Sequence, residues 1–115
     1  MALSSLSSYE LSVNPATISQ KLEAIKAKAA EYSTPSVYTQ CFSGIDLTTL
    51  NATDTLQKGE KMAKSVSDFP NNFKGLPNVA AICVYPSLVN AVRRSLKADG
   101  VKIASVAAGF PASQT

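Results

Sequence analysis

Histidine is absent from this chain of 115 residues, and only two cysteines occur, Cys41 and Cys83. Without histidine there is neither a conventional Ser-His-Asp triad nor a typical zinc site. Two cysteines without a Cys-x-x-Cys spacing do not form a disulfide framework. The five glycines are isolated, so no Walker-type or dinucleotide-binding glycine motif occurs. The sequence therefore predicts a protein without a metal ion or a cofactor.

Long apolar runs are missing as well. No stretch approaches membrane-spanning length, and residues 1–8 lack the basic-then-apolar order of a signal peptide. We therefore expect a cytoplasmic protein that does not bind a membrane. The net charge of +3 is modest, and the lysines are scattered along predicted helices rather than gathered in one patch. That distribution is typical of a solvated helix face, so nucleic acid is not an expected partner.

The composition that is present predicts a globular chain. Hydrophobic residues make up 45% and charged residues 17%, which is sufficient for one domain with its own core. Residues 1–13 are rich in serine and are expected to form a mobile tail. Asn14 followed by Pro15 is typical of a helix start, and apolar residues at helical spacing predict a helix over residues 15–31. A short helix is expected at residues 36–41.

From residue 43 onward the pattern alternates between strands and helices. The predicted elements, in chain order, are a strand at 43–47, a helix at 53–67, a loop at 69–78, a strand at 79–85, a helix that begins at 86 and is closed by Gly100, and a strand at 101–107. This alternation predicts right-handed crossovers and a parallel sheet. The continuous apolar run of the second strand is typical of a strand covered on both faces. Three parallel strands are too few for a closed barrel or for a doubly wound sheet, so the fold is expected to be incomplete.

Asp46 is the candidate site residue that the first strand offers. It lies among apolar residues, and no cation is near it in the sequence. A buried carboxylate is costly unless a cation or hydrogen bonds meet it, so we expect Asp46 to belong to a site. Strand alternation places Gly44, Asp46 and Thr48 on one face and Ile45 and Leu47 on the other. A structural carboxylate that caps a turn at the strand end is the alternative interpretation.

Three segments resemble the first three strands of deoxyribose-phosphate aldolases. They are Ile-Asp-Leu-Thr-Thr-Leu at 45–50, Asn-Val-Ala-Ala-Ile-Cys-Val-Tyr-Pro at 78–86, and Lys-Ile-Ala-Ser-Val at 102–106 with Gly-Phe-Pro after it at 109–111. The segments occur in the family's order and cover residues 43–115. The leading helix is similar to an N-terminal extension of some members. The resemblance implies an α/β chain that is a partial (β/α)₈ TIM barrel, with residues 1–42 as tail and helical extension and residues 43–115 as the first three strands.

The resemblance also implies an activity. The family is a lyase that reversibly cleaves 2-deoxy-D-ribose 5-phosphate into D-glyceraldehyde 3-phosphate and acetaldehyde, in deoxyribonucleotide catabolism, through a Schiff base on lysine and without a metal. The family's lysine lies on the sixth strand within a Lys-Thr-Ser-Thr-Gly motif, which is absent here. Lys102 is expected at the wrong end of the barrel, and Lys74 in an exposed loop. The chain is therefore expected to be inactive alone.

The resemblance assigns roles to four residues. Asp46 corresponds to the family's first-strand aspartate in the polar network around the active lysines and is the expected catalytic residue. Thr48 is expected to hydrogen-bond the substrate, Cys83 to lie close to it without being the nucleophile, and Phe110 to wall the pocket. The alternatives are a strand threonine, a small apolar filler and an aromatic packing residue, respectively.

Two other interpretations stay open. A non-catalytic half-barrel could act as an interaction module that pairs with itself or with a complementary chain. A small flavodoxin-like domain would require a different strand order. For the aldolase, the expected partners are the sugar-phosphate substrate and either a second copy or the missing C-terminal part of the barrel, because the third strand's edge and parts of the sheet would be exposed.

Overall fold

The computed structural model describes residues 12–111, so most of the expected N-terminal tail lies outside the described residues. The chain divides into two units between Thr34 and Pro35. Among residues 12–111, no helix combines the length and the apolar character needed to cross a membrane.

The first unit contains helices α1 (Pro15–Ala27) and α2 (Ala29–Tyr32). Its predicted start is confirmed, because the Asn14 side chain accepts a hydrogen bond of 2.9 Å from the backbone N–H of Ala16. The predicted single helix is interrupted at Lys28, whose backbone N–H donates to the carbonyl of Ile25 at 3.1 Å. That bond spans three residues rather than four, as in the tightened last turn of a helix. None of the residues of α1 is buried.

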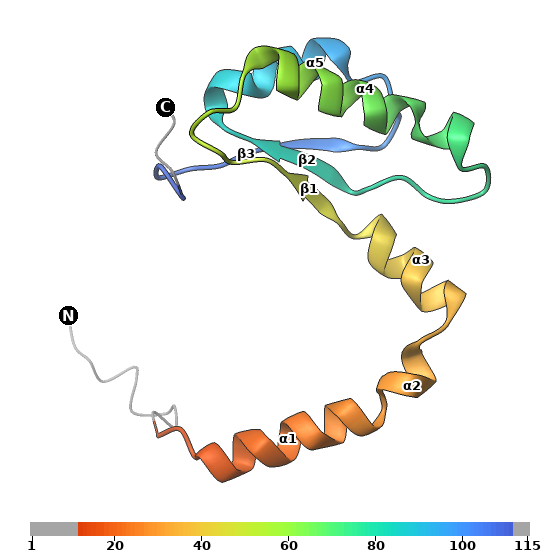
Figure 1. Ribbon diagram of the computed structural model, residues 1–115, viewed down its shortest axis with the longest axis vertical. Helices are drawn as coiled ribbons and strands as arrows, with labels where there is room; N and C mark the ends of the chain where they lie inside the picture. The colour runs from red at the N-terminus through yellow and green to blue at the C-terminus, as the bar shows by residue number, and fades with distance from the viewer. Residues whose placement is uncertain (1–11, 112–115) are drawn as a thin grey trace, which may run out of the picture. The chain divides into compact units, whose positions relative to one another are not determined.

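The second unit begins with α3 and then alternates between strands and helices (Figure 1). Its elements are α3 (Pro35–Ser43), β1 (Asp46–Thr48), α4 (Leu56–Asn72), β2 (Ala81–Val84), the 3₁₀ turn η2 (Pro86–Leu88), α5 (Val89–Ser95) and β3 (Lys102–Ser105). The three strands form one parallel sheet in the order β1-β2-β3. The predicted mixed α/β arrangement with three parallel strands is confirmed. The sequential order differs from the one that a flavodoxin-like sheet requires.

Helices α4 and α5 lie side by side over one face of the sheet (Figure 1). The register aligns Leu47 with Ile82, and Ile82 with Ile103, so these three side chains point from neighbouring strands to the same face. All three belong to, or pack against, the core beneath the helices, which contains Ala63, Val66, Val79, Ile82, Val84, Leu88 and Val92. The other face of β2 is only partly buried, so the expectation that β2 is covered on both faces is not met within the described residues.

Gly59 explains how the two helices approach each other. It is buried in α4, and a Cβ atom at this position would lie 3.3 Å from Cγ2 of Val92 in α5. Val92 is itself fully buried. The missing side chain therefore allows the close packing of α4 against α5. This packing compensates for the destabilisation that a glycine causes in the interior of a helix.

The C-terminal part of α4 corrects the sequence-based prediction. The loop was expected from residue 69, but the helix continues through Pro70 to Asn72. Proline has no N–H to donate to the carbonyl four residues earlier, which here belongs to Val66. The side chain of Asn78 donates to that carbonyl instead, at 2.8 Å. A contact over twelve residues thus replaces the missing helical bond, and no local pattern could reveal it.

The end of α5 also differs from the prediction. The helix ends at Ser95, with Leu96 as the capping residue, so Gly100 does not close it. Gly100 instead adopts a positive φ of 78° in the turn just before β3. Glycine suits that turn because it has no Cβ to clash in the left-handed region.

Candidate functional site

The face of the sheet that α4 and α5 leave uncovered carries the candidate site, and we call it the open face. Its side chains stand in two rows, because every second residue of a strand points to the same side. The rows are Asp46–Ala81–Lys102 and Thr48–Cys83–Ala104, each read across β1, β2 and β3. The sheet therefore brings together three of the four residues expected at the site.

Asp46 is exposed, so the expectation of a buried carboxylate is wrong for the described chain. The physical reason is that, among the described residues of the second unit, no helix or strand packs on the open face opposite α4 and α5. Asp46 is the first residue of β1, whereas Thr48 is the last. Lys102, expected at the end of the barrel away from the site, lies in the same row as Asp46.

Cys83 is half-buried in the middle of the open face. Burial raises the pKa of its thiol, the negative charge of Asp46 raises it further, and a hydrogen bond with the Thr48 side chain lowers it. The net shift is upward from a value of 9.0, so Cys83 is a neutral thiol at pH 7. A neutral thiol suits a residue that lines a site and is a poor nucleophile. Thr48 also donates its hydroxyl hydrogen bond to the backbone carbonyl of Asp46 at 3.0 Å.

Phe110 lies in the segment after β3 and is 67% exposed. It belongs to neither row of the open face. Its exposure is inconsistent with the alternative role of a core packing residue within the described chain.

Asp54 is a residue that the sequence reasoning missed. Its side chain accepts hydrogen bonds from the Thr49 hydroxyl at 2.8 Å and the Asn51 backbone N–H at 3.0 Å, and it forms an ion pair with Lys58. Burial raises the pKa of this carboxyl, but the hydrogen bonds from Lys58, Thr49 and Asn51 outweigh it and hold the pKa at about 2. The cluster fixes the segment that follows the carboxyl end of β1. In the sequence, the signal for this ion pair was the four-residue spacing of Asp54 and Lys58 at the start of a predicted helix.

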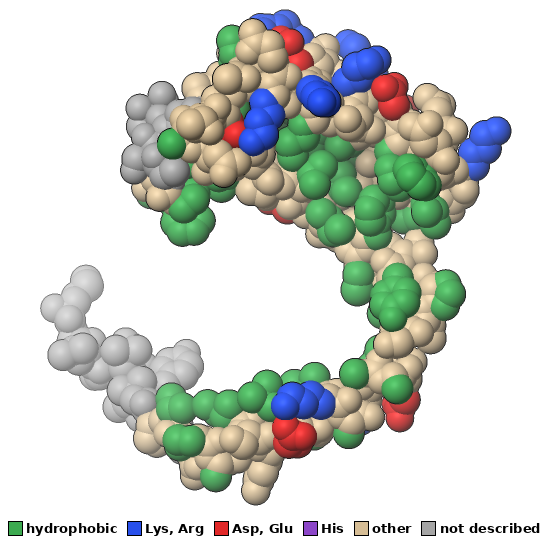
Figure 2. Space-filling model, viewed as in Figure 1, with side chains coloured by type: hydrophobic (Ala, Val, Ile, Leu, Met, Phe, Trp, Pro, Cys, Tyr) green, Lys and Arg blue, Asp and Glu red, His purple; other side chains and the backbone are tan. Residues whose placement is uncertain are grey.

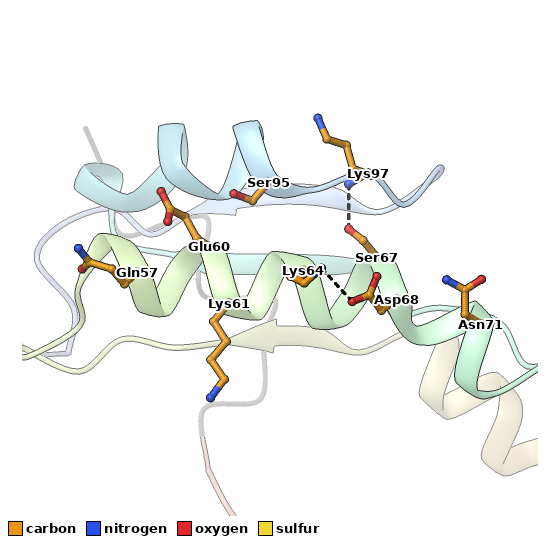
Figure 3. A pocket seen from close by; sticks show the side chains of 9 residues that line it. All are labelled: Gln57, Glu60, Lys61, Lys64, Ser67, Asp68, Asn71, Ser95 and Lys97. Atoms are coloured by element: carbon orange, nitrogen blue, oxygen red, sulfur yellow. Dashed lines mark hydrogen bonds and ion pairs between the residues drawn. The ribbon is translucent and has the colours of Figure 1, made fainter.

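A polar groove lies on the helix side of the sheet, away from the open face. It has a volume of about 760 Å³ and is lined by Gln57, Glu60, Lys61, Lys64, Ser67, Asp68, Asn71, Ser95 and Lys97 (Figure 3). Two of its charges form an ion pair, in which Nζ of Lys64 lies 3.5 Å from Oδ2 of Asp68. The hydroxyl of Ser67 is also engaged, since it accepts from the backbone N–H of Lys97 at 2.8 Å and donates to the carbonyl of Ala63. The groove contains none of the expected site residues.

Apolar side chains gather on one side of the second unit (Figure 2). A pocket of about 230 Å³ in the second unit is lined by Tyr38, Thr39, Phe42, Leu76 and Pro77. The ring of Phe42, which lines this pocket, stacks on the ring of Phe69 with the two centroids 5.1 Å apart. Within residues 12–111, no group of three or more histidine, cysteine, aspartate or glutamate side chains is arranged to hold a metal ion.

The fold and the open face define an α/β chain with three parallel strands, helices on one face and polar side chains on the other. No family model matches the chain. Curated relatives do match: the chain is 39% identical over 82 residues to a deoxyribose-phosphate aldolase of Mus musculus and 40% identical over 83 residues to that of Homo sapiens. A putative deoxyribose-phosphate aldolase of Caenorhabditis elegans is 37% identical over 75 residues.

The extent of these matches is partial. The mouse and human alignments cover 62% of this chain and 26% of each relative, and the nematode alignment covers 61% and 23%. The chain therefore spans about a quarter of the length of the curated relatives that it matches. The resemblance to the deoxyribose-phosphate aldolase family is confirmed over that part.

Proposed function

We propose that this chain is the N-terminal portion of a class I, Schiff-base deoxyribose-phosphate aldolase and provides the first three strands of its (β/α)₈ barrel. The observation that carries the proposal is the identity of about 40% to relatives of that name over 82–83 residues. The three segments that resemble the family's strands contain β1, β2 and β3 in the structure. In the complete enzyme the substrate is 2-deoxy-D-ribose 5-phosphate, and the reaction takes place in the cytoplasm.

The sheet supports the barrel interpretation. In a (β/α)₈ barrel neighbouring strands follow the chain order, each crossover helix packs on the outside, and the opposite face of each strand points inward. The order β1-β2-β3, with α4 and α5 on one face, matches that arrangement. A doubly wound sheet would place helices on both faces. The open face then corresponds to the interior of the barrel, with Asp46, Thr48 and Cys83 pointing into it.

These residues would line the active site and assist a reaction whose Schiff-base lysine lies on another strand. The Asp46 carboxylate would orient a cationic lysine and accept or return a proton. The Thr48 hydroxyl could donate to a substrate oxygen, and Phe110 would close one side of the pocket. Cys83, as a neutral thiol, would line the site without attacking the substrate. The Schiff-base lysine would come from a later strand, so the 115-residue chain would have no aldolase activity of its own.

The experiment that tests the proposal uses the native protein isolated from its cell. We expect an intact mass of at least twice 12.1 kDa and cleavage of 2-deoxyribose 5-phosphate to glyceraldehyde 3-phosphate, measured by a coupled assay. Asp46→Asn in that protein should reduce kcat about 10²- to 10⁴-fold, as expected for a group that moves a proton. A native protein of 12.1 kDa that cleaves no sugar phosphate would overturn the proposal.

Borohydride trapping separates this chain from the whole enzyme. The 115-residue chain incubated with 2-deoxyribose 5-phosphate and sodium borohydride should keep its mass, whereas the native protein should gain one reduced adduct. An adduct on the short chain would show that one of its own lysines forms the Schiff base.

A second candidate is a non-catalytic half-barrel that pairs with itself or with a complementary chain. The open face and the two edge strands, β1 and β3, favour it, because unpaired strand edges and uncovered faces promote association. Sedimentation should then show a dimer or larger species that binds without turnover. A compact monomer with one sharp melting transition would exclude pairing of the chain with itself.

A further inference from the structure

The row Asp46–Ala81–Lys102 places two opposite charges on either side of a small residue. Adjacent strands lie about 4.8 Å apart, so the Cα atoms of Asp46 and Lys102 are separated by about 10 Å across β2. Both side chains point to the open face, because Leu47 and Ile103, which follow them in their strands, pack against the core on the other side. Ala81 contributes only a methyl group to the space between the two charges.

Within residues 12–111, neither Asp46 nor Lys102 forms an ion pair. None of the ion pairs Lys26–Glu23, Lys58–Asp54 and Lys64–Asp68 involves Asp46 or Lys102. Both residues are exposed, so both side chains can reorient. The lysine stem has four flexible carbons, long enough to lean over the Ala81 methyl toward the carboxylate. The pairing requires a rotamer change and no movement of the sheet.

We propose that Lys102 is a positioning residue for Asp46, drawing the carboxylate across Ala81 toward β3 and away from Cys83. The charge pair then forms one layer of the open face, and the row Thr48–Cys83–Ala104 forms the next, about 7 Å further along the strands. The role of this pair in catalysis rests on the proposed function, whereas the pairing itself is a property of the three strands. No cation lies near Asp46 in the sequence, because Lys102 is far from it in the chain and reaches the same row only through the strand register.

The pKa of the Cys83 thiol depends on where the Asp46 carboxylate lies. Cys83 belongs to the adjacent row, and its neighbours across the strands include Thr48 on β1 and Ala104 on β3. Within these two rows, Asp46 and Lys102 are the charged residues. The negative charge of Asp46 raises the pKa of the Cys83 thiol. If Lys102 draws the carboxylate away, its removal lets Asp46 turn toward Cys83, and the thiol becomes harder to ionise.

The experiment measures alkylation of Cys83 by iodoacetamide as a function of pH in the 115-residue chain. Cys41→Ser is the background, so that Cys83 is the only thiol. Lys102→Met should slow alkylation at pH 8 about two- to threefold, as expected from the strength of an exposed ion pair. Asp46→Asn should accelerate it, and Lys102→Arg should restore the rate of the background. Lys61→Met, on the helix side of the sheet, is the matched control and should leave the rate unchanged.

The double variant distinguishes positioning from a direct effect of the lysine charge. A direct Coulomb effect of Lys102 on the thiol is the same whether or not residue 46 is charged. Positioning requires the carboxylate, so Lys102→Met should change the rate less than 1.5-fold in the Asp46→Asn background. An equal effect in both backgrounds, or none in either, would overturn the proposal. Because the measurement needs no turnover, its failure is distinct from loss of aldolase activity in the native protein.

Discussion

The hydroxyl of Tyr85 donates a hydrogen bond of 2.9 Å to the backbone carbonyl of Leu50. Tyr85 directly follows β2 and is fully buried, and Leu50 lies in the segment after β1. The bond therefore joins the chain just beyond the carboxyl ends of two neighbouring strands. Together with the Asp54 cluster it fixes the segment that leads away from Thr48.

Tyr85→Phe removes this bond and leaves the carbonyl of Leu50 without that donor. Loss of one partner of a buried hydrogen bond costs about 1–3 kcal/mol. We therefore expect the melting temperature, measured by circular dichroism, to fall by about 4–8 °C for each kcal/mol. Tyr38→Phe is the control, because Tyr38 is 59% exposed on α3. Equal melting temperatures for both variants would contradict the role of the bond.

Asp54→Asn should destabilise the chain in a way that depends on pH. The pKa of Asp54 is about 2 in the folded state, below its ordinary value of 3.8. Its stabilising contribution is therefore complete above about pH 4 and is lost as the pH falls toward 2. We expect a cost of about 1–2 kcal/mol at pH 7, since half-exposed Lys58 is partly screened by solvent.

Urea unfolding of both proteins between pH 7 and pH 2 measures this effect. The free energies of unfolding should converge at the acid end. Asp68→Asn is the control, because its carboxylate is half-exposed and lies 3.5 Å from Lys64. A constant difference between the original chain and Asp54→Asn over the whole pH range would show that the carboxylate charge is not involved.

Asn78→Ala should destabilise the end of α4, because it removes the donor to the Val66 carbonyl. We expect a cost of about 1–2 kcal/mol. Pro70→Ala provides a backbone N–H that can donate to the same carbonyl. In that background Asn78→Ala should cost at least 0.5 kcal/mol less, a coupling of the size that contacting residues show (roughly 0.5–3 kcal/mol). The free energies of unfolding are measured with urea. If the effects of the two substitutions are additive, the Asn78 side chain does not take the place of the missing backbone N–H of Pro70.

Thr48→Val should raise the pKa of the Cys83 thiol further, because the hydrogen bond with Thr48 lowers it. Valine keeps the branched shape of threonine and removes the hydroxyl. In the Cys41→Ser background we expect iodoacetamide to react more slowly at pH 8. Thr39→Val on α3 is the control, since its hydroxyl donates to the carbonyl of Pro35 and lies on another element. A faster reaction of Thr48→Val would show that Thr48 does not stabilise the thiolate.

The element order was predictable because its signals are local. Asn14 before Pro15 marked a helix start that the structure confirms. The predicted strands at residues 79–85 and 101–107 contain β2 and β3. The boundaries were less accurate, since the ends of α4 and α5 depend on residues distant in the chain. Pro70 continues a helix because Asn78 satisfies a carbonyl, and Gly100 serves a turn rather than a helix end.

The candidate site was only partly predictable. Alternation along one strand correctly separated Asp46 and Thr48 from Leu47, and Cys83 falls on the same face. The sequence could not show that Asp46 is exposed, because burial depends on what packs against a face. The spacing of Asp54 and Lys58 was a local signal for their ion pair. The hydrogen bonds of Asp54 with Thr49 and Asn51 had no such signal, because they form only when the segment after β1 folds back on itself.

The sequence by itself determined the alternation of strands and helices, the polar face of β1 and the resemblance to deoxyribose-phosphate aldolases, because each of these lies in short-range spacing and composition. Only the tertiary structure decided the register. Backbone hydrogen bonds between strands aligned Asp46, Ala81 and Lys102, residues that are separated by up to 56 positions in the chain. Charges that no local pattern connects thereby became neighbours in one row of the open face.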